Sequence, residues 1–237
     1  MLVYRRFNQQ LKSERRRWKA YKGKPIWLPP SNPQKVFQAK HLLHHYAACL
    51  AIVDMLDAKD PYTAEHSIRV SKMCCRLAIM MHLSRAQIIF ATITAGAHDI
   101  GKVGVPDHIL LKEGPLDSYE FDAIKHHSGV GADILLKIRG FEKIASGVWH
   151  HHERWDGTGY PDGQAACDIP LFARMIAICD SIDAMRSTRS YRKGMSDYDC
   201  RQELEKNSGI MYDPDLIALC LANWDFLIGN LYGEYRA

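Results

Sequence analysis

The adjacent pair His98-Asp99, followed by Gly101 and Lys102, is the part of this chain best suited to metal chemistry. The pair places an imidazole nitrogen and a carboxylate on one short piece of backbone. A carboxylate has two oxygens and can bridge two cations, whereas an imidazole binds one. Alone, such a pair is more often a helix end or a surface ion pair, so its meaning depends on what else the chain offers.

Further histidines and aspartates recur downstream at intervals of about one helix plus a loop. The candidate ligands besides His98 and Asp99 are His66, His127, His151, His152 and Asp180. Helices of a bundle can present such side chains inward, so that ligands from different helices converge. Imidazole and carboxylate ligands without cysteine suit iron or manganese better than a structural zinc. Two metals about 3.5–4 Å apart could hold a hydroxide and clamp a phosphoryl group for in-line attack.

The elements that must position these residues are predicted to be helices. From about residue 36 onward apolar residues recur at three- and four-residue steps, and no segment shows the alternation of a strand. Predicted helices cover about residues 37–56, 63–81, 85–97, 118 onward, 141–152, 170–186, 197–206 and 214–224. Ser84 and Asp117 or Ser118 are suited to N-caps, and Asp60-Pro61 to a helix break. We expect Gly101, Gly104 and Pro106 to lie in a loop, and the fold class to be all-α.

Charge divides the chain into a basic segment and an acidic body. Residues 1–40 carry eleven Lys or Arg and one acid, which gives this segment a net charge of +10. Because the whole chain has a net charge of +4, the remaining residues carry −6. We predict a basic N-terminal arm over 1–35, a metal-dependent domain over 36–226 and a C-terminal tail over 227–237. The arm has no repeated basic-aromatic pattern, so nucleic-acid binding is disfavoured, and dimerisation or contact with a partner signalling protein is the expected role.

The composition excludes several other protein classes. No apolar run approaches the ~18 residues that a membrane span requires, and residues 1–10 are too polar for a signal peptide. The seven cysteines are odd in number and form no CxxC pair, which is typical of reduced core thiols. We therefore expect a cytoplasmic protein without a transmembrane segment.

Two long motifs give the chain a family resemblance. They are residues 98–107 (HDIGKVGVPD) and residues 151–161 (HHERWDGTGYP). In this order they resemble the HD-GYP family, the all-helical HD-domain branch of cyclic dinucleotide phosphodiesterases. The resemblance continues through Asp60-Pro61 with His66, Ile169-Pro170-Leu171, and Asp180 to Arg192, and so covers about residues 50–226.

The resemblance implies two metal sites that share one carboxylate. One site would use His66, His98, Asp99 and Asp180, and the other Asp99, His127, His151 and His152. Two divalent ions, Fe(II) or Mn(II), would fill them. Some members have a glutamate for a third metal where this chain has Tyr62, so two are expected.

The resemblance also implies a substrate cleft. Lys102 would point at a substrate phosphate, Asp183 would orient Lys102, and the turn Gly159-Tyr160-Pro161 would border the cleft. Arg189 and Arg192 are similar to the family's phosphate-binding cations. Departures from the family pattern gather around Gln164 and Arg186, where they concern base specificity.

The resulting hypothesis is a metal-dependent phosphodiesterase. A metal-bridging hydroxide would attack one phosphorus of cyclic di-GMP and give linear pGpG, with GMP as a further product. Three alternatives stay open at this point: the same chemistry on 3′,3′-cyclic GMP-AMP, a general HD-type nucleotide phosphohydrolase, and a metal-loaded sensor that acts through partner proteins.

Overall fold

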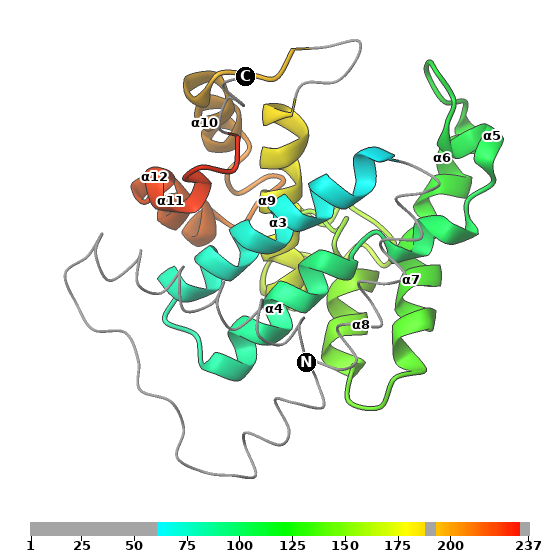
Figure 1. Cartoon of the computed structure of the whole chain (residues 1–237), viewed down its shortest axis with the longest axis horizontal. Coiled ribbons are helices and arrows are strands. Elements are labelled where there is room, and N and C mark those ends of the chain that lie inside the picture. The colour runs from blue at the N-terminus through cyan, green and yellow to red at the C-terminus, as the bar shows by residue number, and fades with distance from the viewer. Residues whose placement is uncertain (1–60, 188–192, 233–237) are drawn as a thin grey trace.

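A computed structural model of the chain describes residues 61–187 and 193–232, whose regular elements are all helices, with no named strand (Figure 1). The all-α prediction is confirmed. The larger helices are α3 (Pro61–Met80), α4 (Arg85–Ala97), α7 (His127–Leu136), α8 (Glu142–Trp149), α9 (Leu171–Arg186), α10 (Asp197–Lys206) and α11 (Pro214–Ala222). Shorter elements are η1 (Ile100–Gly104), α5 (Asp107–Leu110), α6 (Ser118–Lys125), η2 (Ala166–Asp168) and α12 (Trp224–Ile228).

Helix starts follow the capping residues in the sequence. Ser84 and Asp117 each form a capping box, in which the side chain accepts from the third backbone N–H of the helix and that residue's side chain accepts in return from the cap's N–H. Pro170 immediately precedes α9, and Pro61 is the first residue of α3, as its preset φ favours.

Three segments differ from the predicted elements. The expected loop after His98-Asp99 is instead the 3-10 helix η1 followed by the one-turn helix α5. The helix predicted over 141–152 ends at Trp149, and the one predicted over 214–224 ends at Ala222 with α12 starting at Trp224. Single turns contain too few residues to show a period, which explains why the pattern missed η1 and α5.

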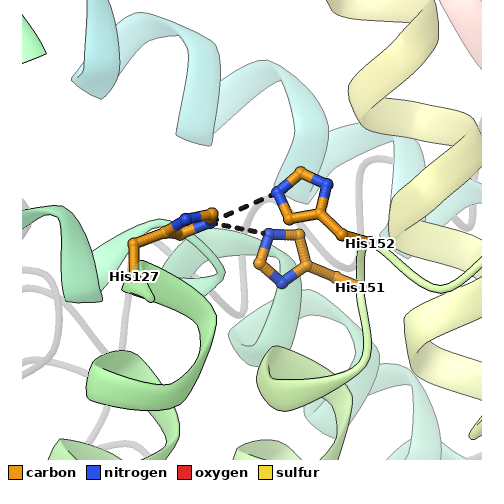
Figure 2. Close-up of side chains that lie close together, drawn as sticks. All are labelled: His127, His151 and His152. Atoms are coloured by element: carbon orange, nitrogen blue, oxygen red, sulfur yellow. Dashed lines mark hydrogen bonds between the residues drawn. The ribbon is translucent and has the colours of Figure 1, made fainter. Parts of the chain in front are cut away.

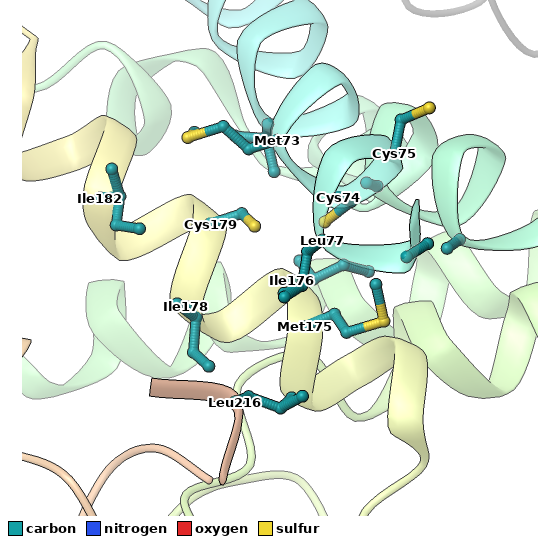
Figure 3. Close-up of a cluster of buried hydrophobic side chains, with 14 of the residues drawn as sticks. Met73, Cys74, Cys75, Leu77, Met175, Ile176, Ile178, Cys179, Ile182 and Leu216 are labelled. Atoms are coloured by element: carbon teal, nitrogen blue, oxygen red, sulfur yellow. The ribbon is translucent and has the colours of Figure 1, made fainter. Parts of the chain in front are cut away.

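The core lies where α9 crosses α3 (Figure 3). Met73, Cys74 and Leu77 of α3 face Met175 and Cys179 of α9, and all five are fully buried. Helix α4 packs beside α3, α8 contacts α4, α7 and α9, and η1 contacts α7 (Figure 1). The six cysteines of the described residues are free thiols.

Some predictions lie outside the described residues. These are the basic arm over 1–35 and the helix over 37–56. The division at residue 226 stays a prediction, although Leu227 and Ile228 of the predicted tail are buried in the core. Among the helices described, none is both long and apolar enough to cross a bilayer.

Candidate metal centre

The predicted ligands come from the ends or faces of five separate segments. His66 lies in α3, His98 ends α4 and Asp99 starts η1. His127 begins α7, His151 and His152 directly follow α8, and Asp180 lies in α9. The packing of these elements brings the seven side chains together: six of them form two groups of three, and Asp99 lies between the groups.

The first group is His66, His98 and Asp180, whose ligand atoms lie within 4.8 Å of one another. His66 Nε2 is 3.3 Å from His98 Nε2 and 3.3 Å from Asp180 Oδ1. His66 and His98 are buried, while the Asp180 side chain is 26% exposed. The group is therefore open to solvent on the Asp180 side.

The second group is His127, His151 and His152, shown in Figure 2. His127 Nε2 lies 3.2 Å from His151 Nε2 and 3.3 Å from His152 Nε2. The three rings come from two sides, one from the start of α7 and two from the turn after α8, and their Nε2 atoms meet in the space between (Figure 2).

Asp99 stands between the two groups. Its Oδ2 is 3.4 Å from His98 Nε2 and 3.8 Å from His66 Nε2, whereas its Oδ1 is 3.5 Å from His127 Nε2. Burial opposes ionisation of Asp99, but the charge of Lys102 and the neighbouring histidines outweigh it and hold the pKa of this carboxyl well below its usual value. An ionised carboxylate with one oxygen toward each group has the geometry of a bridging ligand.

In three of the histidines, the hydrogen bond made by Nδ1 shows which ring nitrogen can bind a cation. Nδ1 of His98, His127 and His151 lies 2.6–2.7 Å from the backbone oxygen three residues earlier, so Nδ1 carries the proton and donates. Nε2 then holds a lone pair. Lone pairs of neighbouring rings at 3.2–3.3 Å repel one another unless a cation lies between them.

Electrostatics favours the neutral, metal-binding form in the second group. Burial lowers the pKa of His127 and lowers that of His151 well below its usual value, and burial with the neighbouring His127 lowers the pKa of His152 to about 4. The imidazoles of the second group therefore fit a divalent metal, which requires deprotonated ligands. The described residues offer two such sites with Asp99 between them.

Gly101 explains how Asp99 reaches His127. A Cβ at Gly101 would lie 1.8 Å from the backbone oxygen of His127 and 2.5 Å from the backbone nitrogen of Gly131. The backbone of η1 therefore rests directly on α7, which only glycine permits. This contact fixes Asp99 beside the start of α7.

His66 is held differently from the other histidines, by a side chain. Its Nδ1 donates to Asp183 Oδ2 at 2.8 Å. Burial disfavours protonation of His66, but this hydrogen bond and the charges of Asp180 and Asp99 outweigh it and raise the pKa. Asp183 is fully buried and also accepts from Arg69, so it positions His66 rather than meeting substrate or orienting Lys102 as expected. Arg69 lies three residues after His66 in α3, a helical spacing that could have revealed it.

Lys102 contacts the centre through Asp99. Its Nζ donates to Asp99 Oδ2 at 2.7 Å, and its side chain is 26% exposed. A cation bound at Asp99 would compete with this ammonium for the same oxygen, and the partly exposed side chain could then turn toward a substrate anion.

The Gly159-Tyr160-Pro161 turn lies against the ligand segment. A Cβ at Gly159 would be 2.3 Å from the backbone nitrogen of Arg154, and Tyr160 N donates to the His152 backbone oxygen at 3.3 Å. The Tyr160 ring stacks on the His152 ring with centroids 4.8 Å apart, while Pro161 is exposed. The turn therefore lies beside the second group of histidines, and its role at a substrate cleft stays a prediction.

The sequence analysis missed an anchor of this turn. Asp162 Oδ2 accepts from Trp149 Nε1 and lies 3.0 Å from His150 Nε2, and the Asp162 backbone N–H donates to Glu153 Oε1 at 2.7 Å. In the sequence, the adjacent histidines at 150–152 indicated metal binding and gave no sign that one of them anchors the turn. Arg189 and Arg192, the expected phosphate-binding cations, lie outside the described residues.

Known proteins resemble the chain in sequence over this region. The profile of the HD-domain family matches residues 51–216. A 3′3′-cGAMP-specific phosphodiesterase 2 of Vibrio cholerae is 35% identical over 179 residues, which are 75% of this chain and 34% of that protein. A cyclic di-GMP phosphodiesterase of Thermotoga maritima is 37% identical over 171 residues, 71% of this chain and 46% of that protein. The chain thus spans a third to a half of the length of these curated relatives.

Solved structures show the same fold. The cyclic GMP-AMP specific phosphodiesterase V-cGAP3 of V. cholerae superposes with a TM-score of 0.60 at 21% identity, over 80% of this chain and 51% of that one. An HDG"Y"P protein of Bdellovibrio bacteriovorus gives a TM-score of 0.52 at 17% identity, over 72% and 52%. The fold and the paired His/Asp groups are those of a divalent-metal-binding HD domain. The chain belongs to the HD-domain family, whose profile matches residues 51–216.

Proposed function

We propose that this chain is a metal-dependent phosphodiesterase that opens a cyclic dinucleotide, with cyclic di-GMP as the substrate and linear pGpG as the product. The observation that carries the proposal is the position of Asp99, with one oxygen toward each of two imidazole groups. A carboxylate so placed can hold two cations at the short separation used for phosphoryl transfer. Relatives named as cyclic dinucleotide phosphodiesterases support the substrate class.

The metals proposed are two divalent ions, Fe(II) or Mn(II), held by His66, His98, Asp180 and Asp99 in one site and by His127, His151, His152 and Asp99 in the other. When bound, such a pair polarises a phosphodiester and activates water. Imidazole and carboxylate donors without thiolate suit these ions. No cysteine thiol belongs to either group.

The chain's own residues would bind and orient the substrate. Lys102, at the edge of the centre and partly exposed, supplies a cation for the phosphate next to the scissile bond. Tyr160 offers an aromatic face beside His152, on which the sugar or base would rest. We assign phosphate binding to Arg189 and Arg192 as well, on the strength of their place after α9 in the sequence.

A second substrate is 3′,3′-cyclic GMP-AMP. Three relatives from Vibrio cholerae are named as specific for this molecule. The residues that depart from the family pattern lie around Gln164, near the Gly159-Tyr160-Pro161 turn, and Arg186, at the end of α9. These positions concern the base and leave the proposed metal ligands untouched.

The test is turnover of cyclic di-GMP and of cyclic GMP-AMP, separated by chromatography, after anaerobic loading with Fe(II) or Mn(II). The parent chain should produce the linear dinucleotide, and Asp99→Ala should lose both turnover and bound metal. Asp133→Ala removes an exposed carboxylate from α7 and should match the parent. A parent chain that binds two metals yet cleaves neither substrate would contradict the proposal and favour a sensor.

A further inference from the structure

We propose that Tyr232, close to the C-terminal end of the described residues, is a positioning residue of the metal centre and acts on His66 through Asp183. The proposal rests on the metal centre of the proposed function. It also adds a residue that lies beyond the segment 51–216 matched by the family profile.

Asp183 has donors on both of its oxygens. Oδ1 accepts from Arg69 Nε at 2.6 Å and from the Tyr232 hydroxyl at 2.7 Å. Oδ2 accepts from His66 Nδ1 at 2.8 Å, and from Arg69 Nη2 and Ser187 Oγ at 3.1 Å each. A carboxylate with about four lone-pair positions is thereby saturated, which fixes the plane of the group and hence the direction in which His66 is held.

The Tyr232 ring is fixed by two arginines. The guanidinium carbon of Arg69 lies 5.9 Å from the ring centroid and that of Arg186 lies 5.2 Å from it. Burial and the charge of Asp183 raise the pKa of Tyr232 well above its usual value, so the hydroxyl keeps its proton and donates. The donor therefore arrives from a defined direction, as the short hydrogen bond requires.

The orientation of His66 is more sensitive to a change in its hydrogen-bond partner than the orientation of His98, His127 or His151 is. His98, His127 and His151 donate to backbone oxygens three residues earlier in their own chain segments, which no side-chain change displaces. His66 depends on a side chain 117 residues away, and that side chain depends in part on Tyr232, a further 49 residues on. Packing of α12 on α3 brings this C-terminal segment to the centre.

The experiment is a Mn(II) titration of the full chain, in which electron paramagnetic resonance measures free Mn(II). Tyr232→Phe removes the hydroxyl and keeps the ring. It should weaken one of the two sites by roughly 3- to 10-fold, less than the ~10–100-fold typical of a partner that contacts the ligand directly. Tyr198→Phe removes an exposed hydroxyl from α10 and should leave both constants unchanged.

A double-mutant cycle separates positioning from general destabilisation. In an Asp183→Ala background, which lacks the acceptor, Tyr232→Phe should cause no further loss of Mn(II) affinity, because the two residues act in series. Equal losses in both backgrounds, or parent-like constants for Tyr232→Phe, would overturn the proposal. A parent chain that binds no Mn(II) would overturn it together with the metal centre. Parent Mn(II) binding without turnover would count against the proposed reaction alone.

Discussion

Asp99 shows how much one residue can decide in this protein. Each of its two oxygens faces a different group of ligands, and Oδ2 also accepts a hydrogen bond from Lys102. The bridging geometry depends on the position of this carboxylate, whose two oxygens lie 3.4 Å from His98 Nε2 and 3.5 Å from His127 Nε2. The neighbouring histidines favour cation binding by this carboxylate, whereas Lys102 forms an ion pair with it.

Lys102→Ala should separate substrate binding from metal binding. The ammonium contacts Asp99 but belongs to neither imidazole group, so we expect both metals to stay bound. Loss of a cation beside a phosphoryl group should lower turnover about 10²–10³-fold. Elemental analysis and steady-state hydrolysis of cyclic di-GMP test this on the same sample. A variant with full activity would remove Lys102 from the reaction.

Gly101→Ala should disturb the centre through the backbone. The new methyl would meet the His127 backbone oxygen at 1.8 Å, and η1 would have to move off α7. We expect a loss of unfolding free energy of about 3 kcal/mol, at the upper end for overpacking, together with weaker metal binding. Urea denaturation and a metal titration provide the measurements.

The matched control for this change is Gly104→Ala, at the other end of η1. Its Cβ would meet a Val130 methyl at 3.2 Å, and a side chain can yield where a carbonyl cannot. Neither glycine has a positive φ, so backbone strain is the same for both. The control should cost less than about 1 kcal/mol. Equal losses for both variants would contradict the backbone-contact explanation.

At the scale of elements, five of the seven proposed ligands lie where a helix ends or begins, while His66 and Asp180 lie within α3 and α9. His98 ends α4, His127 begins α7, and His151 and His152 follow α8. A terminus leaves the helical path and can direct a side chain toward a neighbouring helix. The stability of each helix therefore matters more to this centre than its length does.

Ser84→Ala tests whether the stability of α4 can be lowered without loss of metal binding at its other end. Ser84 forms the capping box with Gln87 at the start of α4, the end far from His98. Its loss should lower the unfolding free energy by about 1 kcal/mol, whereas Ser84→Asp should keep most of the stability. Metal content should be unchanged in both variants. Urea denaturation gives the first quantity, and a Mn(II) titration that showed a lost site would refute the second expectation.

The sequence predicted elements well where a local signal existed. Capping residues such as Ser84 and Asp117 marked helix starts that the structure contains, and the adjacent His and Asp residues identified the groups that converge. The features that the sequence did not predict are either very short elements or contacts between residues far apart in the chain. The 3-10 helix η1 spans too few residues for a period, and the hydrogen bond from Tyr232 to Asp183 joins positions that no local pattern relates.

For the whole molecule, metal removal should have a large effect on stability. Metals that bind only the folded chain stabilise it by about 2.7 kcal/mol per site at a hundredfold excess over Kd. In a domain of this size, that corresponds to roughly 5–10 °C in Tm per site. Scanning calorimetry with Mn(II) and with EDTA measures the shift, and Asp99→Ala should show little response. Equal Tm values for the parent in both buffers would contradict metal binding to the folded state.

The order of the ligands along the chain also has a consequence in time. His66 comes first, and Asp180 and Asp183 follow more than a hundred residues later. A ribosome releases the histidines well before the carboxylates that complete one group and orient its first member. A nascent chain halted before α9 would therefore carry imidazoles able to capture ions in non-native arrangements. Only a chain that has emerged past α9 can bring together the full set of proposed ligands.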